Sequence, residues 1–281
     1  MDIAQRQPRE TGRAPEHVMW TGAGHDEASW PIMICLLGNF RLFRAGEFVP
    51  IRAGGKREAL LAQLALHAGR RVSRERLVHA IWPTRDRALG LNSLNNLVHS
   101  LHKHLGHALH DAAPVLHEDG YYRLNVEAGI GVDVTCFDSL VETGDCKMQR
   151  GNACVAVECY RRAAALYRDD LCLAADAPTI VERERLRARY LWVLAQLSDQ
   201  AYRTGDYHGA LEHLWRLLAR DPYREDAHRL VMRCYVRRGE RAAALHQFQV
   251  CVALLRDEFD APPEPATVAL FDQIRLQPDL L

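Results

Sequence analysis

The 281-residue sequence lacks the long apolar runs and secretory features that mark membrane and exported proteins. No apolar run approaches the roughly 18 residues that a membrane-spanning helix needs, so we expect no membrane partner. Residues 1–30 have no uninterrupted apolar stretch and carry five acidic residues, which argues against a secretory signal. We therefore expect a cytoplasmic protein whose residues 1–31 form a disordered tail.

Paired cysteines and catalytic motifs are missing as well. None of the eight cysteines forms a CxxC pair, which favours reduced thiols, mostly in the core, and no metal site. No GxSxG, P-loop GxxxxGK[ST] or GxGxxG motif occurs. The sequence therefore predicts a protein that is not an enzyme and carries no cofactor.

The chain also lacks an overall charge, because 36 basic residues balance 36 acidic ones. The balance is uneven along the chain, however. Residues 31–130 hold thirteen basic and eight acidic residues, together with eight of the fourteen histidines. Residues 131–281 hold twenty basic and twenty-three acidic residues. A mildly basic module beside a mildly acidic one is typical of a nucleic-acid reader joined to a sensor or partner domain.

The segment 32–130 reads as a small sheet, three helices and a hairpin. Apolar alternation at 34–43 and 48–51, joined by a turn at 44–47, predicts antiparallel strands. Helices are predicted over 56–69, which Gly69 ends, and over 73–82, which Ser73 caps and Pro83 ends. A third helix and a hairpin at 115–125 complete the layout of a winged helix-turn-helix.

The third helix has a buried stripe of leucines and valine spaced by three and four residues. The outer face carries the candidate DNA contacts Asn92, Asn95, Asn96, His99, His102 and Lys103. Asparagine can bond adenine at two points in the major groove, and lysine can hold phosphate. Two other interpretations stay open: a merely solvated face, and a metal site at the histidines, although no carboxylate or cysteine completes a tight set.

Three segments carry a resemblance to a known family. They are KREALLAQLALHAGRRVSRERLVHAIW (56–82), NSLNNLVHSLHKHLG (92–106) and GYYRL (120–124). Together they resemble the DNA-binding domain of the Streptomyces antibiotic regulatory protein family, a winged helix of the OmpR type. The resemblance extends over about residues 34–275. It implies that the third helix docks in the major groove and that the hairpin lies near the minor groove.

This chain departs from the family at the DNA-facing surface. The family usually presents arginines on the second half of the third helix, where this sequence has His99, His102 and Lys103. The hairpin tip is Glu118-Asp119, and carboxylates facing phosphate would weaken binding. Four arginines remain as candidate phosphate contacts: Arg70, Arg71, Arg74 and Arg76.

The segment 131–281 contains an internal repeat. Residues 203–211 match residues 237–245 at a spacing of 34, with glycine, alanine and leucine aligned. A looser copy places Gly151 and Ala156 at the same internal spacing. A period of 34 with glycine at a tight turn is typical of tetratricopeptide repeats, so we expect an all-α repeat domain.

The segments LYRDDLCLAADAP (166–178) and ERERLRARY (182–190) are similar to the bacterial transcriptional activator domain. That resemblance implies dimerisation, ligand or partner sensing, or contact with RNA polymerase. The arginines of the second segment favour a solvated face, and an anion or nucleotide contact is the alternative. They are Arg183, Arg185, Arg187 and Arg189.

The sequence thus predicts a mainly α chain: an α+β winged helix-turn-helix at 32–130, then an all-α tetratricopeptide-like repeat domain at 131–281. The expected function is a transcriptional regulator that binds double-stranded DNA as a homodimer, with RNA polymerase or a small-molecule effector as further candidate partners. The alternative is a repeat scaffold or small-ligand sensor, nucleotides included, whose winged helix binds protein. The polar outer face of the third helix favours the first interpretation. The acidic hairpin tip and the scarcity of arginines on that helix favour the second.

Overall fold

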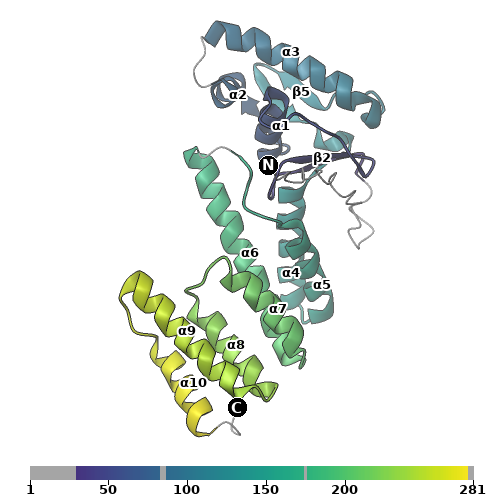
Figure 1. Ribbon diagram of the computed structural model, residues 1–281. Coiled ribbons are helices and arrows are strands. Elements are labelled where there is room, and N and C mark those ends of the chain that lie inside the picture. The colour runs from purple at the N-terminus through teal and green to yellow at the C-terminus, as the bar shows by residue number, and fades with distance from the viewer. Residues whose placement is uncertain (1–29, 83–86, 174–175, 278–281) are drawn as a thin grey trace, which may run out of the picture.

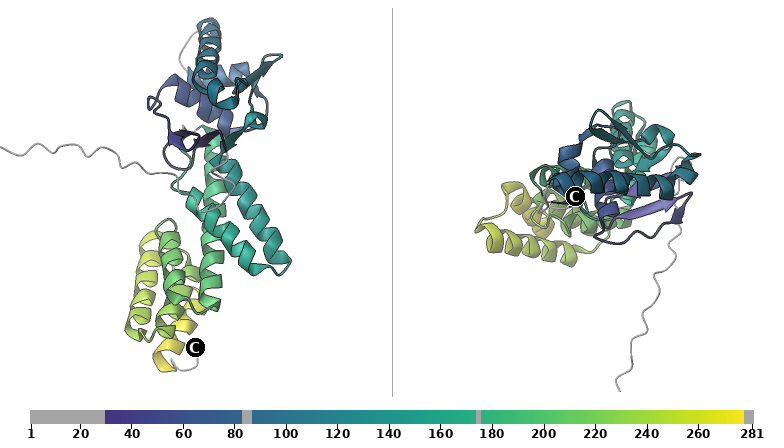
Figure 2. Two further views of the ribbon diagram at one scale, coloured as in Figure 1. Left: turned by 90° about the vertical axis from the view of Figure 1, so that its right-hand side faces the viewer. Right: turned by 90° about the horizontal axis from the view of Figure 1, so that it is seen from above.

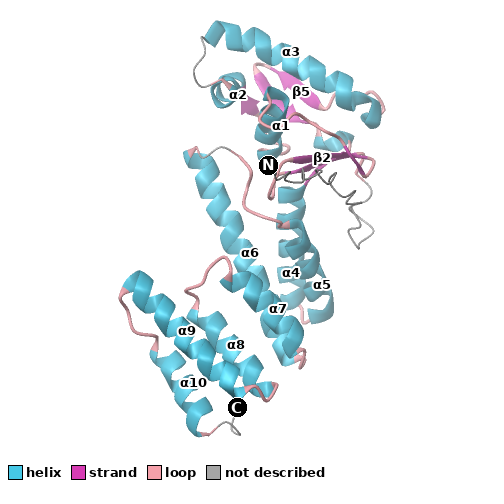
Figure 3. Ribbon diagram, in the orientation of Figure 1, coloured by secondary structure: helices cyan, strands magenta, loops and turns pink. Residues whose placement is uncertain are grey.

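The computed structural model describes residues 30–82, 87–173 and 176–277. The predicted tail, up to residue 29, and the predicted helix stop at Pro83 lie outside these residues. Two small sheets and three helices form one end of the molecule, and a stack of helices extends from them (Figures 1 and 3). The left view in Figure 2 shows the same elongated arrangement. The predicted fold class, a winged helix-turn-helix followed by a helical repeat domain, is confirmed.

The first sheet has the order β3-β2-β1-β7. Its strands are β1 (Ile32–Cys35), β2 (Arg41–Arg44), β3 (Glu47–Phe48) and β7 (Ile130–Val132). The predicted continuous strand over 34–43 is wrong, because Gly38, with φ of +93°, turns the chain between β1 and β2. The predicted turn at 44–47 is confirmed, but residues 49–51 do not continue β3.

The helices α1 (Lys56–Leu66), α2 (Arg74–Ile81) and α3 (Arg87–Leu105) follow. The Ser73 cap is confirmed, since its Oγ accepts a hydrogen bond from the Arg76 backbone N–H at 3.3 Å. The wing is the hairpin of β5 (Val115–Glu118) and β6 (Tyr121–Leu124), and β4 (Val72–Ser73) pairs with β6. Short 3-10 turns at Gly106–Leu109 and Val126–Ala128 flank the hairpin.

The second domain is built from seven helices within the described residues. They are α4 (Asp133–Gln149), α5 (Ala153–Leu166), α6 (Ala177–Arg203), α7 (Tyr207–Leu218), α8 (Glu225–Arg237), α9 (Arg241–Phe259) and α10 (Pro265–Leu276). Neighbours pack as α4 on α5, α6 on α7 and α8 on α9.

The 34-residue period is visible in the geometry of these pairs. Gly205 and Gly239 follow the first helix of two successive pairs, and both lie in the left-handed region, with φ of +81° and +78°. Ala210 and Ala244 are fully buried where the second helix of each pair packs. A small side chain there lets two helices approach closely, which explains why the sequence repeats it.

The prediction that most cysteines lie in the core is only partly right. All eight cysteines are free thiols, but only Cys35, Cys159, Cys234 and Cys251 are buried, so the core prediction is right for half of them. Burial raises the pKa of Cys35 to about 12, which keeps this thiol protonated. Across the residues that the structure describes, no helix combines the length and apolar character required to cross a bilayer.

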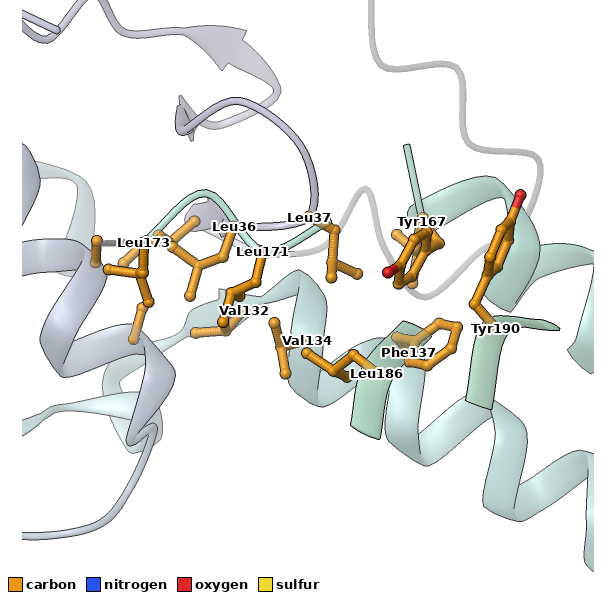
Figure 4. Close-up of a cluster of buried hydrophobic side chains, with 14 of the residues drawn as sticks. Leu36, Leu37, Val132, Val134, Phe137, Tyr167, Leu171, Leu173, Leu186 and Tyr190 are labelled. Atoms are coloured by element: carbon orange, nitrogen blue, oxygen red, sulfur yellow. The ribbon is translucent and has the colours of Figure 1, made fainter. Parts of the chain in front are cut away.

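The two domains share one continuous core, shown in Figure 4. Leu36 and Leu37, which follow β1, face Leu171 and Leu173 from the segment after α5 (Figure 4). Leu37 pairs with Leu171 in an antiparallel bridge, and the Cys172 N–H donates to the Leu36 carbonyl at 3.0 Å. The predicted boundary between residues 130 and 131 cuts through β7, which is parallel to β1. A strand of three residues is too short to show an alternation in the sequence.

Asp133 fixes this junction. Its buried carboxylate accepts hydrogen bonds from the backbone N–H groups of Leu36 at 2.8 Å and Leu37 at 2.9 Å. It also accepts from its neighbour Val134 at 2.8 Å, at the start of α4. Burial raises the pKa of Asp133 to about 6, and the three backbone donors act in the opposite direction. One side chain therefore satisfies the end of β1 and the first turn of α4 together.

The arginine run on α6 binds neighbouring elements. Arg183 donates to the carbonyls of Leu171 at 3.2 Å and Leu173 at 2.7 Å, and so holds the junction segment. Arg185 and Arg189 both contact Asp138 of α4, at 2.7 and 3.1 Å. Arg187 donates to the Arg220 carbonyl. Arg183, Arg187 and Arg189 are half-buried and bond acceptors from other segments, so neither a solvated face nor an anion site describes them. Arg185 is exposed and also pairs with Glu182 of its own helix at 2.7 Å, as a solvated face predicts.

The buried His228 is expected to make the free energy of unfolding depend on pH. Its Nε2–H donates to the Pro222 carbonyl at 2.9 Å, and Gln247 donates to its Nδ1 at 2.6 Å, so the ring is neutral. Burial lowers the pKa of His228 below its usual value. The unfolded chain then binds the proton more tightly, and stability is lost as pH falls below about 6.5.

Urea denaturation at pH 7.5 and at pH 5.5 measures this effect. We expect the wild type to lose more stability across that interval than His228→Gln does. The comparison isolates His228 from His67 and His213, whose pKa values burial also lowers. Equal losses in the two proteins would contradict the assignment.

Candidate nucleic-acid interface

The helix α3 presents a buried face and an exposed face, as expected from the sequence. Leu94, Val98, Leu101 and Leu105 are buried, and Leu97 is half-buried. Of the predicted DNA contacts on α3, Asn95, Asn96, His99 and Lys103 are exposed. Asn92 belongs to α3, but its side chain lies outside the described residues.

Two of the predicted contacts bind the wing. The half-buried His102 donates from Nε2 to the Val115 carbonyl of β5 at 3.0 Å. Asn95 Oδ1 accepts a hydrogen bond from the Tyr122 hydroxyl of β6 at 2.9 Å. The His117 ring stacks on Tyr122 with a centroid distance of 4.3 Å. These contacts hold the hairpin against α3 and leave Asn96, His99 and Lys103 as the exposed polar set clear of the wing.

The predicted phosphate contacts divide in a similar way. Arg71 forms an ion pair of 3.0 Å with Glu118 at the wing tip, and both side chains are well exposed. Arg70 and Arg76 are exposed, and Arg74 is half-buried. The Arg74 backbone N–H donates to the Gly120 carbonyl, so the start of α2 is joined to the wing turn. The ion pair offsets one of the two wing-tip carboxylates but also occupies one arginine.

Arg76 lies near the second domain. The pKa of Asp176, at the start of α6, is lowered chiefly by hydrogen bonds from Thr179 and further by the charges of Arg76 and His67. Part of the positive charge of α2 therefore acts on the junction. The histidines at the end of α3 do not converge on a metal: among the described residues, no three His, Cys, Asp or Glu side chains are placed to share an ion.

The structure contains two clefts that the sequence did not predict. One, of about 630 Å³, lies between α3 and residues 49–57, which are the loop after β3 and the start of α1. The other, of about 420 Å³, lies between the end of α5 and α7. In the second, Arg220 lies over the stacked rings of Tyr167 and Tyr190, and it pairs with Asp169 and Asp170. Residues far apart in sequence line both clefts, so no local pattern indicates them.

Comparison with known proteins agrees with this architecture. The model of the bacterial transcriptional activator domain matches residues 132–275. The chain is 28% identical over 268 residues to the regulatory protein AfsR of Streptomyces coelicolor, covering 95% of this chain and 26% of AfsR. It is 25% identical over 245 residues to the transcriptional regulatory protein MoaR1 of Mycobacterium tuberculosis, covering 86% of this chain and 78% of MoaR1. The chain thus spans about a quarter of the length of AfsR.

A solved structure shares the fold over both domains. Mycobacterium tuberculosis EmbR, in complex with a low affinity phosphopeptide, superposes with a TM-score of 0.72. The match covers 88% of this chain and 66% of that chain, at 21% identity. The likeness therefore extends through the winged helix and the helical stack. The predicted resemblance to Streptomyces antibiotic regulatory proteins is confirmed by these relatives together.

Proposed function

Because the chain belongs to the bacterial transcriptional activator domain family, we propose that it regulates transcription by binding promoter DNA through its winged helix. The observation that carries this proposal is the exposed polar face of α3, with Asn96, His99 and Lys103 clear of the wing. A helix of this kind fits the major groove, where asparagine reads adenine and lysine holds phosphate. Arg70 and Arg76 are further exposed positive charges on the same domain.

We propose that the helical domain serves assembly: a homodimer on two half-sites, with contact to RNA polymerase or an effector. The support is the family membership of residues 132–275 and the presence of exposed aromatic side chains on this domain, Trp192 and Trp215. Two-fold symmetry of protein and operator would match.

The test is binding to a duplex from the chain's own promoter region, followed across salt, with the mass of the complex measured in the same samples. A specific complex with two chains per duplex, whose log affinity falls linearly with log salt, supports the proposal. Absence of binding by micromolar protein at about 50 mM salt contradicts it. That outcome favours the alternative, a repeat scaffold or ligand sensor whose winged helix binds protein.

Asn96→Ala is the sharpest single change at the interface. We expect it to weaken specific binding by about 1–3 kcal/mol, because a bidentate contact to one base is lost. Thermal stability should stay unchanged, since the side chain is exposed. The readout is affinity for the specific duplex relative to a scrambled one. Asn152→Ala, at an exposed position before α5, is the matched control and should bind as the wild type does.

Glu118→Gln is expected to strengthen DNA binding. Removing the carboxylate frees Arg71 from its 3.0 Å ion pair and deletes a negative charge at the wing tip. One more phosphate contact would steepen the salt dependence by about 0.9 in the log–log slope. Fluorescence anisotropy between 50 and 200 mM salt measures the slope. An unchanged slope would show that Arg71 does not reach phosphate.

A further inference from the structure

The larger cleft has an apolar floor at the back of the candidate DNA-binding helix. It lies between α3 and residues 49–57 and has a volume of about 630 Å³; we refer to it as the α3 cleft. Leu42, Leu101 and Leu105 form its buried floor, and Val49, Ile51 and Leu97 are half-buried along it. Residues 97, 101 and 105 lie on the side of α3 opposite the exposed Asn96, His99 and Lys103. A cavity of this size and lining is suited to a small organic molecule.

The rim of the α3 cleft is basic. Arg52, Lys56, Arg57 and His104 line it, and all four are exposed. Lys56 donates to the Ile81 carbonyl at 2.5 Å, and Arg57 lies 3.4 Å from His104 Nε2. Within the described part of the chain, no carboxylate forms an ion pair with Arg52, Lys56 or Arg57. The nearby Glu58 accepts from the Gly54 N–H at 3.1 Å.

The smaller cleft is different in this respect. Its Arg220 pairs with Asp169 and Asp170, and its Arg216 donates to the Ala164 carbonyl and the Tyr190 hydroxyl. Both arginines of the smaller cleft therefore already have partners inside the protein. Arg52, Lys56 and Arg57 of the α3 cleft surround an apolar floor, and within the described residues no carboxylate pairs with them.

We propose that the α3 cleft binds an amphipathic organic anion, a carboxylate or sulfonate that carries an apolar chain or ring. The anionic head would bind Arg52 and Arg57 at the rim, where charge-assisted bonds are strong. The apolar part would cover Leu97, Leu101 and Val49 and release water from them. Both halves of such a ligand match chemistry that this one cleft presents.

A ligand in the cleft would contact α3, which contributes floor residues on one side and the exposed Asn96 on the other. Ligand binding could therefore change the DNA affinity of α3. This coupling rests on the proposed function, whereas ligand binding does not. A ligand changes DNA affinity only by as much as its own affinity differs between the free and DNA-bound forms. Linkage then requires DNA to change ligand affinity by the same factor.

The test uses decanoate as the probe, titrated by calorimetry into the full chain without DNA. We expect saturable binding at one site, and about tenfold weaker binding of the uncharged decanol. The double variant Arg52→Gln/Arg57→Gln should bind decanoate at least about tenfold more weakly. Val49→Trp, which fills the cleft, should abolish binding of both probes. Arg44→Gln removes an exposed arginine of β2 outside the cleft and should bind as the wild type does.

Three outcomes would overturn the proposal: no saturation with millimolar decanoate, equal binding by the double variant, or an equal loss in Arg44→Gln. Circular dichroism of each variant separates these outcomes from unfolding. If the chain binds decanoate but not its promoter duplex, the proposed function is wrong and the ligand site is supported. If it binds DNA but not decanoate, the ligand site is wrong and the proposed function is supported.

Discussion

Replacing Asp133 with alanine is expected to lower the free energy of unfolding by about 3–5 kcal/mol, because buried backbone donors lose their acceptor. The N–H groups of Leu36 and Leu37 bond this carboxylate at 2.8 and 2.9 Å, and Asp133 is only 1% exposed. Urea denaturation followed by circular dichroism at 222 nm, near pH 7.5, measures the loss.

Asp133→Asn is the matched control for this change. It keeps one acceptor oxygen of the same shape, so we expect it to lose clearly less stability than the alanine variant. A loss below about 1 kcal/mol for Asp133→Ala would show that the junction does not depend on this carboxylate. Equal losses for the two variants would assign the effect to the charge and not to the acceptor geometry.

Tyr167→Ala is the second change with a large expected effect. The ring is 2% exposed, stacks on Tyr190 at 4.1 Å and lies 5.7 Å from Phe137, so its removal opens a large cavity. We expect a loss of about 3–5 kcal/mol. Tyr167→Phe removes only the 2.7 Å bond to Asp170 and should cost about 1 kcal/mol.

Hydrogen exchange distinguishes a local from a shared defect in Tyr167→Ala. Tyr167 lies four residues before Leu171, which pairs with Leu37 across the domain junction. We therefore expect the amides of residues 36–38 in the first domain to exchange faster in the alanine variant. Protection of those amides equal to that of the wild type would mean that the two domains unfold independently.

Features set by local chemistry were predictable from the sequence. The Ser73 cap, the hairpin at 115–125 and the tight turns at Gly205 and Gly239 all depend on residues within a few positions of one another. The 34-residue period was equally accessible, because each helix pair repeats its own packing pattern. The junction was not, because Asp133 bonds residues 96 and 97 positions away.

The candidate interface shows the same limit. Periodicity placed Asn96, His99 and Lys103 on the outer face of α3, where the structure finds them exposed. It could not separate them from His102 and Asn95, whose partners Val115 and Tyr122 come from the wing. The ion pair of Arg71 with Glu118 likewise joins residues 47 positions apart. Long-range pairing of this kind leaves no mark on helical periodicity.

The shared core at Leu36, Leu37 and Leu171 has a consequence for operator architecture. The winged helix and the helical domain are joined through this core. Two chains in the proposed dimer would therefore hold their α3 helices at a fixed separation and rotation. Inserting about 5 base pairs between half-sites would turn one of them to the opposite side of the duplex, beyond reach of such a pair. Inserting about 10 base pairs would restore the phase but lengthen the span by about 34 Å. Spacing, as well as base sequence, would then define a functional promoter for this protein.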